Sequence, residues 1–208
     1  MKSVKIVLAL FVMISLLHPQ DEEWEEDLSS YRQGGAVFTM AETGSGFGGF
    51  ITWPLLRNMQ FGTAMDFLFI RDSKEITVQS LYSYYPVTIN KVNNVYLMDL
   101  FLIGKKRLFA ESMDESFRPF VSAAFGIVYG INHPEDWAKR PEPDGLGKTN
   151  QSDLTLGGFL GTGIDIKAGT TYFFSIRVQY RIMPFSTTIG ETNNHSMIEL
   201  RFELGKLF

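Results

Sequence analysis

The segment HSMIELRFELGKLF, residues 195–208, gives the clearest indication of the fold class. From position 198 onward its side chains alternate between two kinds. The apolar set is Ile198, Leu200, Phe202, Leu204 and Phe208, and the other set is Glu199, Arg201, Glu203 and Gly205. Successive side chains of a β-strand point to opposite faces, so this period predicts a strand with one apolar and one charged face.

Two earlier segments repeat this pattern. In 171–183, Tyr172, Phe174, Ile176, Val178, Tyr180 and Ile182 alternate with Ser175, Arg177, Gln179 and Arg181; in 153–167, Leu154, Leu156, Leu160, Ile164 and Ile166 alternate with Thr155, Gly157, Gly161, Gly163 and Asp165. Five fainter strands are expected at 33–42, 46–55, 59–71, 94–107 and 117–131. No long helical pattern separates these strands, which predicts an all-β fold with eight antiparallel strands in up-and-down order.

Connection lengths point to a particular kind of barrel. The connections 56–58 and 168–170 are short, whereas 72–93, 132–152 and 185–194 are long and polar. Short and long connections therefore fall at opposite ends of the sheet. Two connections depart from this rule: the turn 43–45 is short although it lies at the long-loop end, and the connection 108–116 is longer than expected for the short-turn end. An even strand number with this loop arrangement is typical of a bacterial outer-membrane barrel, whose short turns and termini face the periplasm.

Composition limits the other possibilities. The chain has 208 residues, 45% of them hydrophobic, with no Cys and a formal net charge of −4. One domain is expected at this length. The absence of Cys excludes a disulfide framework, thiolate metal sites and a cysteine nucleophile. The mildly acidic balance offers no basic stripe for a phosphate backbone, so we expect no nucleic-acid partner.

The N-terminus has the features of an export signal. Lys2 and Lys5 precede a stretch, 6–17, that is apolar except for Ser15 and too short to span a bilayer. We expect a signal peptide over residues 1–20, cut somewhere between 17 and 23, with an uncleaved anchor as the alternative. Residues 21–30 follow as an acidic, solvated periplasmic leader whose core reads DEEWEED, residues 21–27, with an acidic docking peptide as the alternative. The barrel domain is then expected over residues 31–208.

The alternation alone does not say which face meets the solvent. A soluble, lipocalin-like barrel that binds a lipophilic ligand keeps its apolar face inside, whereas a membrane barrel turns it toward lipid. The interior of an eight-stranded barrel is just wide enough to be filled by side chains. The small residues Gly62, Ala64, Gly157, Gly161 and Gly163 share the charged faces, which indicates that these faces are the crowded interior. A transmembrane β-barrel is therefore expected over the soluble alternative.

The sequence resembles a known group of proteins in residues 31–208. The segments FRPFVSAAFG (117–126), LGGFLGTGID (156–165) and RVQYR (177–181), together with the terminal Phe208, resemble the small outer-membrane β-barrel domains, which include OmpA-like and OmpX-like proteins. The resemblance implies an outer-membrane location and lipid bilayer contact. It also implies that Phe208, preceded by Leu204, Phe202 and Leu200, is a signal for the barrel-assembly machinery, although Lys206 departs from that pattern.

Charged residues on the inward faces form the candidate site. They are Asp66, Asp99, Asp165, Arg177, Arg181, Glu199, Arg201 and Glu203. Isolated charges in a narrow lumen are costly, so mutual pairing is expected. The preferred interpretation is a structural network that plugs the barrel, with a gated polar path or a small-ligand site as the alternative. Eight strands leave no open channel, which favours the plug.

Catalytic and metal signals are weak, and no enzyme activity, cofactor or metal is expected. His195 and Ser196 are neighbours and point to opposite faces of a strand, which argues against a lipid-modifying pair; both are expected to face solvent. His133 lacks metal-ligand spacing around it. The stretch GSGFGG, residues 44–49, lacks the helix and the Lys-Ser/Thr pair of a phosphate loop. The expected role is structural, or binding through the long extracellular loops to a ligand that the sequence does not identify.

Overall fold

The structure, a computed structural model, describes residues 31–56, 58–72, 76–79, 86–89, 91–109, 117–143, 145–169 and 171–208. The expected signal peptide, 1–20, and acidic leader, 21–30, lie outside the described residues. Within the described part of the chain, no helix is long and apolar enough to cross a membrane.

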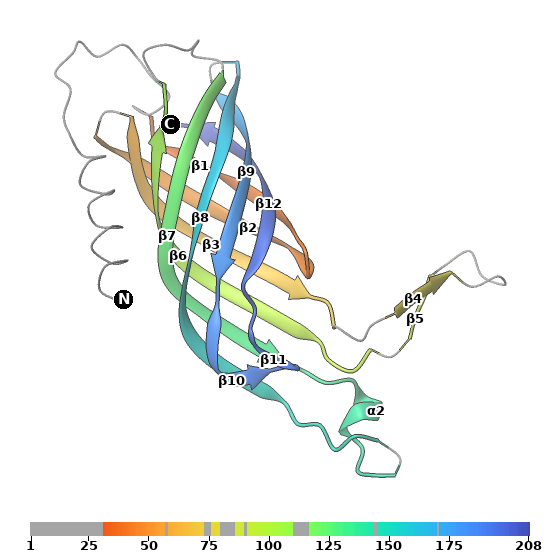
Figure 1. Cartoon of the computed structure of the whole chain (residues 1–208). Helices are drawn as coiled ribbons and strands as arrows, with labels where there is room; N and C mark the ends of the chain where they lie inside the picture. Colours follow the sequence, from red (N-terminus) through yellow and green to blue (C-terminus); the bar gives the residue numbers. More distant parts are fainter. Residues whose placement is uncertain are drawn as a thin grey trace.

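Eight long strands of the described residues close into an antiparallel barrel (Figure 1). They are β1 (Gln33–Ala41), β2 (Gly44–Leu56), β3 (Met59–Ile70), β6 (Val95–Arg107), β7 (Phe117–Asn132), β8 (Gln151–Ala168), β9 (Tyr172–Ile182) and β12 (Met197–Leu207). Each corresponds to a strand that the alternation predicted, with small shifts at the ends. The predicted all-β, eight-stranded antiparallel fold is confirmed.

The first and last barrel strands pair with each other and close the sheet. Their register runs from Gln33 opposite Leu207 to Ala41 opposite Glu199. The order around the wall is β1-β12-β9-β8-β7-β6-β3-β2. This is up-and-down connectivity, interrupted only by short elements inside three of the loops. Closure leaves no open strand edge, which is the condition for a sheet to span lipid.

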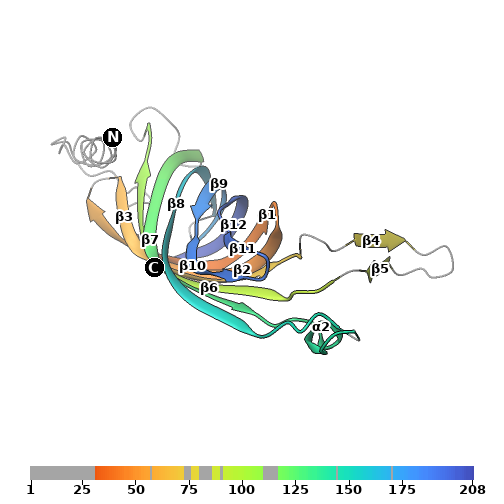
Figure 2. The ribbon, with the colours of Figure 1, turned by 60° about the horizontal axis from the view of Figure 1, so that its bottom comes forward.

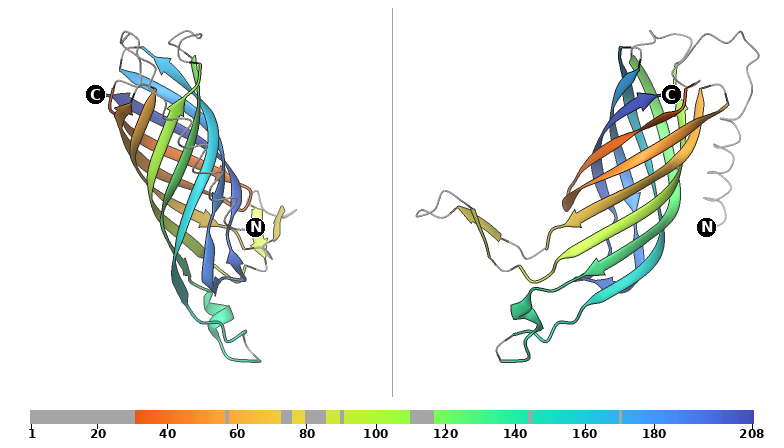
Figure 3. Two further views of the ribbon diagram at one scale, coloured as in Figure 1. Left: turned by 60° about the vertical axis from the view of Figure 1, so that its left-hand side comes forward. Right: turned by 180° about the vertical axis from the view of Figure 1, so that it is seen from behind.

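The long connections gather at one end of the barrel and carry further short elements. These are the hairpin β4 (Ile76–Gln79) and β5 (Pro86–Ile89), the helical turn α2 (Asp136–Lys139), and the hairpin β10 (Pro184–Ile189) and β11 (Thr192–Asn194). Figure 2 shows β4 and β5 projecting away from the barrel. The chain's C-terminus lies at the opposite end, as both views of Figure 3 show. The segregation of long and short connections expected from the sequence is therefore present.

The apolar faces point outward and the charged faces inward. Phe47, Leu100, Phe125, Leu160, Val178 and Leu204 are each at least half exposed, whereas Arg177, Arg181 and Arg201 are among the largest fully buried side chains. The interior is also crowded where the sequence has glycine. A Cβ placed on Gly163 would lie 2.7 Å from Cζ of Phe120, closer than real contacts allow. This distribution is the reverse of a water-soluble barrel and matches a wall that faces lipid.

Candidate functional site

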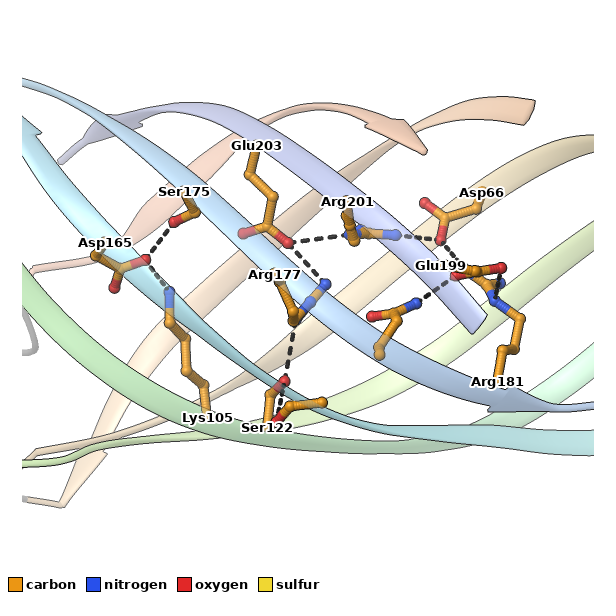
Figure 4. Close-up of polar contacts among 12 residues, drawn as sticks. Asp66, Lys105, Ser122, Asp165, Ser175, Arg177, Arg181, Glu199, Arg201 and Glu203 are labelled. Carbon is orange, nitrogen blue, oxygen red and sulfur yellow. Dashed lines mark hydrogen bonds and ion pairs between the residues drawn. The ribbon is translucent and has the colours of Figure 1, made fainter. Parts of the chain in front are cut away.

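The lumen is the candidate site, and it contains every inward charge named from the sequence. All eight of those side chains are buried within the barrel, none more than 3% exposed. They come from β3, β6, β8, β9 and β12, so the barrel wall brings together residues far apart in the chain. Figure 4 shows most of them converging on one another.

Arg181 on β9 is the centre of the largest group. Its Nη2 lies 2.9 Å from Oδ2 of Asp66 on β3, and its Nε lies 2.8 Å from Oε1 of Glu199 on β12. Its Nη1 donates a hydrogen bond to Oδ2 of Asp99 on β6. Gln179 donates from Nε2 to the second oxygen of Glu199 at 2.6 Å. One guanidinium thus ties three strands to β9 across the lumen.

A second group joins the first through Asp66. Arg201 on β12 donates from Nη1 to Oδ2 of Asp66, the same oxygen that Arg181 contacts. The Nε of Arg201 lies 3.0 Å from Oε1 of Glu203, and that oxygen also accepts from Nη2 of Arg177 at 2.7 Å. The three arginines and their carboxylates therefore form one continuous network along the barrel axis.

Asp165 forms a separate group nearer the C-terminal end. Its Oδ1 accepts hydrogen bonds from Nζ of Lys105 at 2.7 Å and from Oγ of Ser175, and its Oδ2 lies 3.2 Å from Nη2 of Arg107. Lys105 and Arg107 were not singled out from the sequence. The signal was present, because both continue the alternation that places Asp99 on the inner face of β6.

Aromatic rings fill the space between the charged groups. The guanidinium carbon of Arg177 lies 4.8 Å from the ring centre of Phe159, and that of Arg181 lies 5.3 Å from the ring centre of Phe101. The two rings also meet edge to face at 5.8 Å. Because a ring face attracts a cation, these contacts stabilise the arginines where water is excluded. They also leave little room for a continuous polar path.

An apolar layer closes the lumen on the long-loop side. Leu68, Leu97, Met183, Phe185, Ile189 and Met197 are all buried in one cluster there. Phe185 and Ile189 belong to β10, which follows directly after β9 and runs alongside β8. The loop thus supplies side chains that cover the mouth of the barrel.

A chain of polar contacts joins the bases of the long loops. Asp72 accepts through Oδ2 from the backbone N–H of Asn93 at 2.6 Å and from its side-chain Nδ2 at 3.1 Å. Asn132 donates from Nδ2 to Asn93 at 2.9 Å and to Gln151 at 3.1 Å. Gln151 also accepts from the backbone N–H of Gly190 at 2.8 Å. This belt fixes three loops to one another at the barrel rim.

The expectation that His195 and Ser196 face solvent is wrong for His195. Its side chain is buried, its Nε2 lies 3.1 Å from the carbonyl oxygen of Ile189, and its ring meets Phe185 edge to face. The loop 183–196 folds back over the mouth and covers this ring. Burial lowers the pKa of His195 from its ordinary value of 6.5. Ser196 accepts from the backbone N–H of Met183 and donates to Asn194, so it does not contact His195 as a nucleophile contacts its base.

Of the other weak signals, residues 44–49 begin strand β2, and His133 lies in a loop. His133 is exposed, with Nε2 2.8 Å from Nζ of Lys139. Among the described residues, no three His, Asp or Glu side chains approach closely enough to hold a metal ion. A cavity of about 460 Å³ opens at the long-loop end, bounded by Arg71, Asp72, Asn93 and His195 among others.

Phe208 lies on the outer surface of the barrel at its short-turn end, opposite the long loops. Its side chain is 64% exposed, and its ring centre lies 5.6 Å from Nζ of Lys206. Its backbone N–H donates to the carbonyl oxygen of Arg32, beside β1. An exposed aromatic ring at this level matches the aromatic girdle of membrane barrels.

The closed wall of eight strands, the apolar exterior and the buried charged interior define a small transmembrane β-barrel. Solved structures of outer-membrane proteins share this fold. The N-terminal β-barrel domain of OprF from Pseudomonas aeruginosa covers 86% of this chain and 98% of its own, at 12% identity and a TM-score of 0.52. Neisserial surface protein A covers 86% of this chain and 96% of its own, at 13% identity and a TM-score of 0.53. The predicted likeness to small outer-membrane barrels is confirmed at the level of fold.

No protein-family model matches the sequence, and no curated protein matches it either.

Proposed function

We propose that this protein is a plugged outer-membrane barrel whose lumen charges stabilise the fold and whose long loops make the contacts at the cell surface. The observation that carries this proposal is the network around Arg181, because four strands meet there through buried ion pairs. A conducting lumen needs a hydrated path, whereas these groups are paired with one another and packed against rings. The proposed role is structural or binding rather than transport.

The proposed location is the outer membrane, and the apolar exterior of the barrel supports it. The apolar exterior requires a bilayer, and an exported chain of this fold reaches the outer membrane after removal of its signal peptide, 1–20. Phe208 acts in this proposal as the signal for the barrel-assembly machinery. Separation of inner and outer membranes on a density gradient tests the location. Recovery in the outer-membrane fraction supports it, and recovery in the soluble periplasmic fraction contradicts it.

Conductance in planar bilayers tests the plug. The wild-type protein should give no steady channels, whereas the Arg181→Ala variant, which empties space at the centre of the network, should show intermittent openings. Steady wild-type conductance would exclude the plug and favour the gated polar path. The matched control is Lys148→Ala in the loop 133–150, which leaves the lumen intact.

Absence of enzyme activity is part of the proposal. The side chains of His195 and Ser196 contact different hydrogen-bond partners, so they do not form a nucleophile and base in contact with each other. An assay of lipid A deacylation with the wild-type protein and the His195→Ala variant tests this. Activity that disappears in the variant would contradict the proposal.

A further inference from the structure

A second cavity, of about 230 Å³, opens on the outer side of the barrel rim at the long-loop end. It lies where β3 ends and where β2 and β6 begin. Ser45, Phe69 and Tyr96 line it, and the strand register places these three residues side by side across β2, β3 and β6. All three side chains are exposed on the lipid-facing side of the wall. The cavity is therefore open to the surroundings of the barrel rather than to its lumen.

The side chains around this cavity carry positive charge. Arg71, directly after β3, and Lys91, four residues before β6, both line it. None of the described residues that line it has a carboxylate. The larger cavity inside the mouth differs, because the carboxylates of Glu42 and Glu191 border it together with Arg71. The outer side of the rim is therefore the side that favours an anion.

Lys91 is held beside the cavity by contacts with the loop after β7. Its carbonyl oxygen accepts a hydrogen bond from Nε1 of Trp137 at 3.1 Å. Its Nζ lies 3.8 Å from Oε1 of Glu135, near the longest distance of an ion pair, and both side chains are about 40% exposed. Exposed pairs of this kind contribute little to stability. The ammonium group can therefore bind an anion in the cavity at a small loss.

Aromatic rings lie just below these two cations on the outer wall. The ring centre of Phe69 lies 5.8 Å from that of Tyr96 and 5.9 Å from that of Phe47. In membrane barrels, girdles of aromatic residues mark the two levels at which the hydrocarbon core meets the headgroups. Arg71 and Lys91 come from the connection beyond the strand ends, so they lie on the headgroup side of this level. Lipid phosphates are anions found at that level.

The size and the donors of the cavity suit a phosphate group. Its volume is below the roughly 300–1,000 Å³ of pockets that enclose a whole small molecule, so it fits one group of a larger ligand. A guanidinium presents paired N–H donors to phosphate oxygens, and an ammonium adds a compact positive charge. The hydroxyls of Ser45 and Tyr96 supply two further donors.

We propose that this cavity binds the phosphate group of a lipid headgroup in the leaflet that surrounds the long-loop end. Arg71 and Lys91 neutralise the phosphate, and the rings of Phe69 and Tyr96 contact the part of the lipid below it. A bound headgroup also fixes the bases of two long loops at the bilayer surface, because both cations belong to one loop and Lys91 contacts the other. The inference rests on the proposed outer-membrane location, since it requires a leaflet at this level.

Titration of the refolded protein in neutral micelles with lipid A, a glycolipid that carries two phosphates, tests the cavity. Native mass spectrometry measures the fraction of the protein that retains the lipid. The wild-type protein should bind lipid A saturably and should bind its chemically dephosphorylated form much more weakly. Raising the salt concentration from about 0.1 M to about 1 M should reduce binding severalfold, because the screening length falls from about 10 Å to about 3 Å.

Matched variants locate the site. Arg71→Gln combined with Lys91→Gln should weaken the binding of lipid A roughly thirtyfold, or about 2 kcal/mol, as expected for two cations at a lipid surface. The control, Arg140→Gln combined with Lys148→Gln, removes the same charge at the same end from residues that do not line the cavity, and should keep nearly the wild-type affinity. Arg71→Lys should lie between the two, because it keeps the charge and loses the paired donors. The urea unfolding midpoints of all variants in micelles should match that of the wild type.

Three results of the titration would overturn the proposal. Wild-type affinity in the double variant at positions 71 and 91 would show that lipid A binds elsewhere. An equal loss in the loop control would show attraction by the overall charge of this end rather than by the cavity. Displacement of lipid A by an equal concentration of inorganic phosphate would show that the cavity selects a free anion.

The titration is independent of the cellular location, so its failure is distinct from a failure of the proposed function. Loss of binding in micelles would exclude the lipid site and leave the outer-membrane location untouched. Recovery of the protein in the soluble periplasmic fraction would contradict the location, and with it the lipid site, whatever affinity is measured in micelles.

Discussion

Arg181 and Asp66 are 115 positions apart in the sequence, yet Nη2 of the arginine lies 2.9 Å from Oδ2 of the aspartate inside the barrel. The contact crosses from β9 to β3, two strands that do not pair with each other. It makes the charged lumen a tertiary link between opposite parts of the wall, in addition to the hydrogen bonds that join neighbouring strands.

Replacing Arg181 by leucine should therefore destabilise the barrel. Removal of the guanidinium leaves Asp66, Asp99 and Glu199 without their shared cation, and breaking a buried ion pair on one side costs about 3–5 kcal/mol. Urea unfolding in micelles measures the change. Arg71→Leu, at an exposed position of the rim, is the control and should cost less than about 1 kcal/mol.

A companion variant separates pairing from packing. Arg181→Met combined with Asp99→Asn and Glu199→Gln removes charge from both sides, and we expect it to recover a large part of the lost stability. An Arg181→Leu midpoint equal to that of the wild type would show that the carboxylates do not depend on this arginine.

Gly190 should be intolerant of any side chain. Its φ is +70°, and a Cβ would lie 2.9 Å from Cγ2 of Val95. Gly190→Ala therefore combines backbone strain of about 1–2 kcal/mol with overpacking of about 1–3 kcal/mol. Gly147→Ala is the control, because Gly147 also has a positive φ, +61°, but nothing lies within 4 Å of its Cβ position. Unfolding midpoints should fall further for Gly190→Ala, and equal losses would mean that the Val95 contact relaxes freely.

The stability of the long-loop end should depend on pH through His195. Burial lowers the pKa of its imidazole, so the folded protein binds its proton less readily than the unfolded chain. The free energy of unfolding therefore contains the full contribution of His195 at pH values above 6.5, the ordinary pKa that applies to the unfolded chain. This contribution decreases as the pH falls below 6.5, and it stops decreasing once the pH is below the lowered pKa of the folded protein.

Urea midpoints between about pH 7.5 and pH 5 check this dependence. Glu42, Arg71, Asp72 and Glu191 border the same cavity, so the difference between the wild type and His195→Gln is used to isolate the contribution of the histidine. A His195→Gln profile that matches the wild type would contradict the assignment.

Variants of the last two residues should distinguish effects on assembly in cells from effects on the stability of the folded barrel. Deleting Phe208 removes an exposed ring and one backbone hydrogen bond, so we expect a near-normal unfolding midpoint in micelles but a severalfold fall in the amount assembled in cells. Leu207→Ala removes a buried side chain that packs with Phe173, and should cost about 2–5 kcal/mol in micelles. Normal assembly after deletion of Phe208 would exclude its role as a signal.

The alternation of side chains predicted the strands because every barrel strand has two chemically different faces. It also placed Asp99 inside, and the same period extended along β6 would have placed Lys105 and Arg107 there. It did not predict which charges pair, because Arg181 meets Asp66 only through closure of the barrel and the stagger of its strands.

The buried state of His195 was not predicted for a different reason. It depends on β10 continuing beyond β9 and on the loop 183–196 folding over the mouth, where Phe185 and Ile189 enclose the ring. These contacts join an irregular segment to the barrel rim, and no period in the sequence encodes them. The β4–β5 hairpin, likewise, lies within a stretch that the sequence indicated only as a long polar loop.

The apolar face of the barrel wall is expected to contact lipid, and a cysteine scan of β7 measures this contact. The chain has no native Cys, so Ser122→Cys, Ala123→Cys, Ala124→Cys and Phe125→Cys each introduce a single thiol. In vesicles, the thiols at positions 123 and 125 should react with a membrane-soluble fluorescent maleimide and be quenched by brominated lipid, whereas those at 122 and 124 should resist labelling. The reverse pattern, or labelling of 123 and 125 by a water-soluble maleimide without lipid quenching, would contradict the claim.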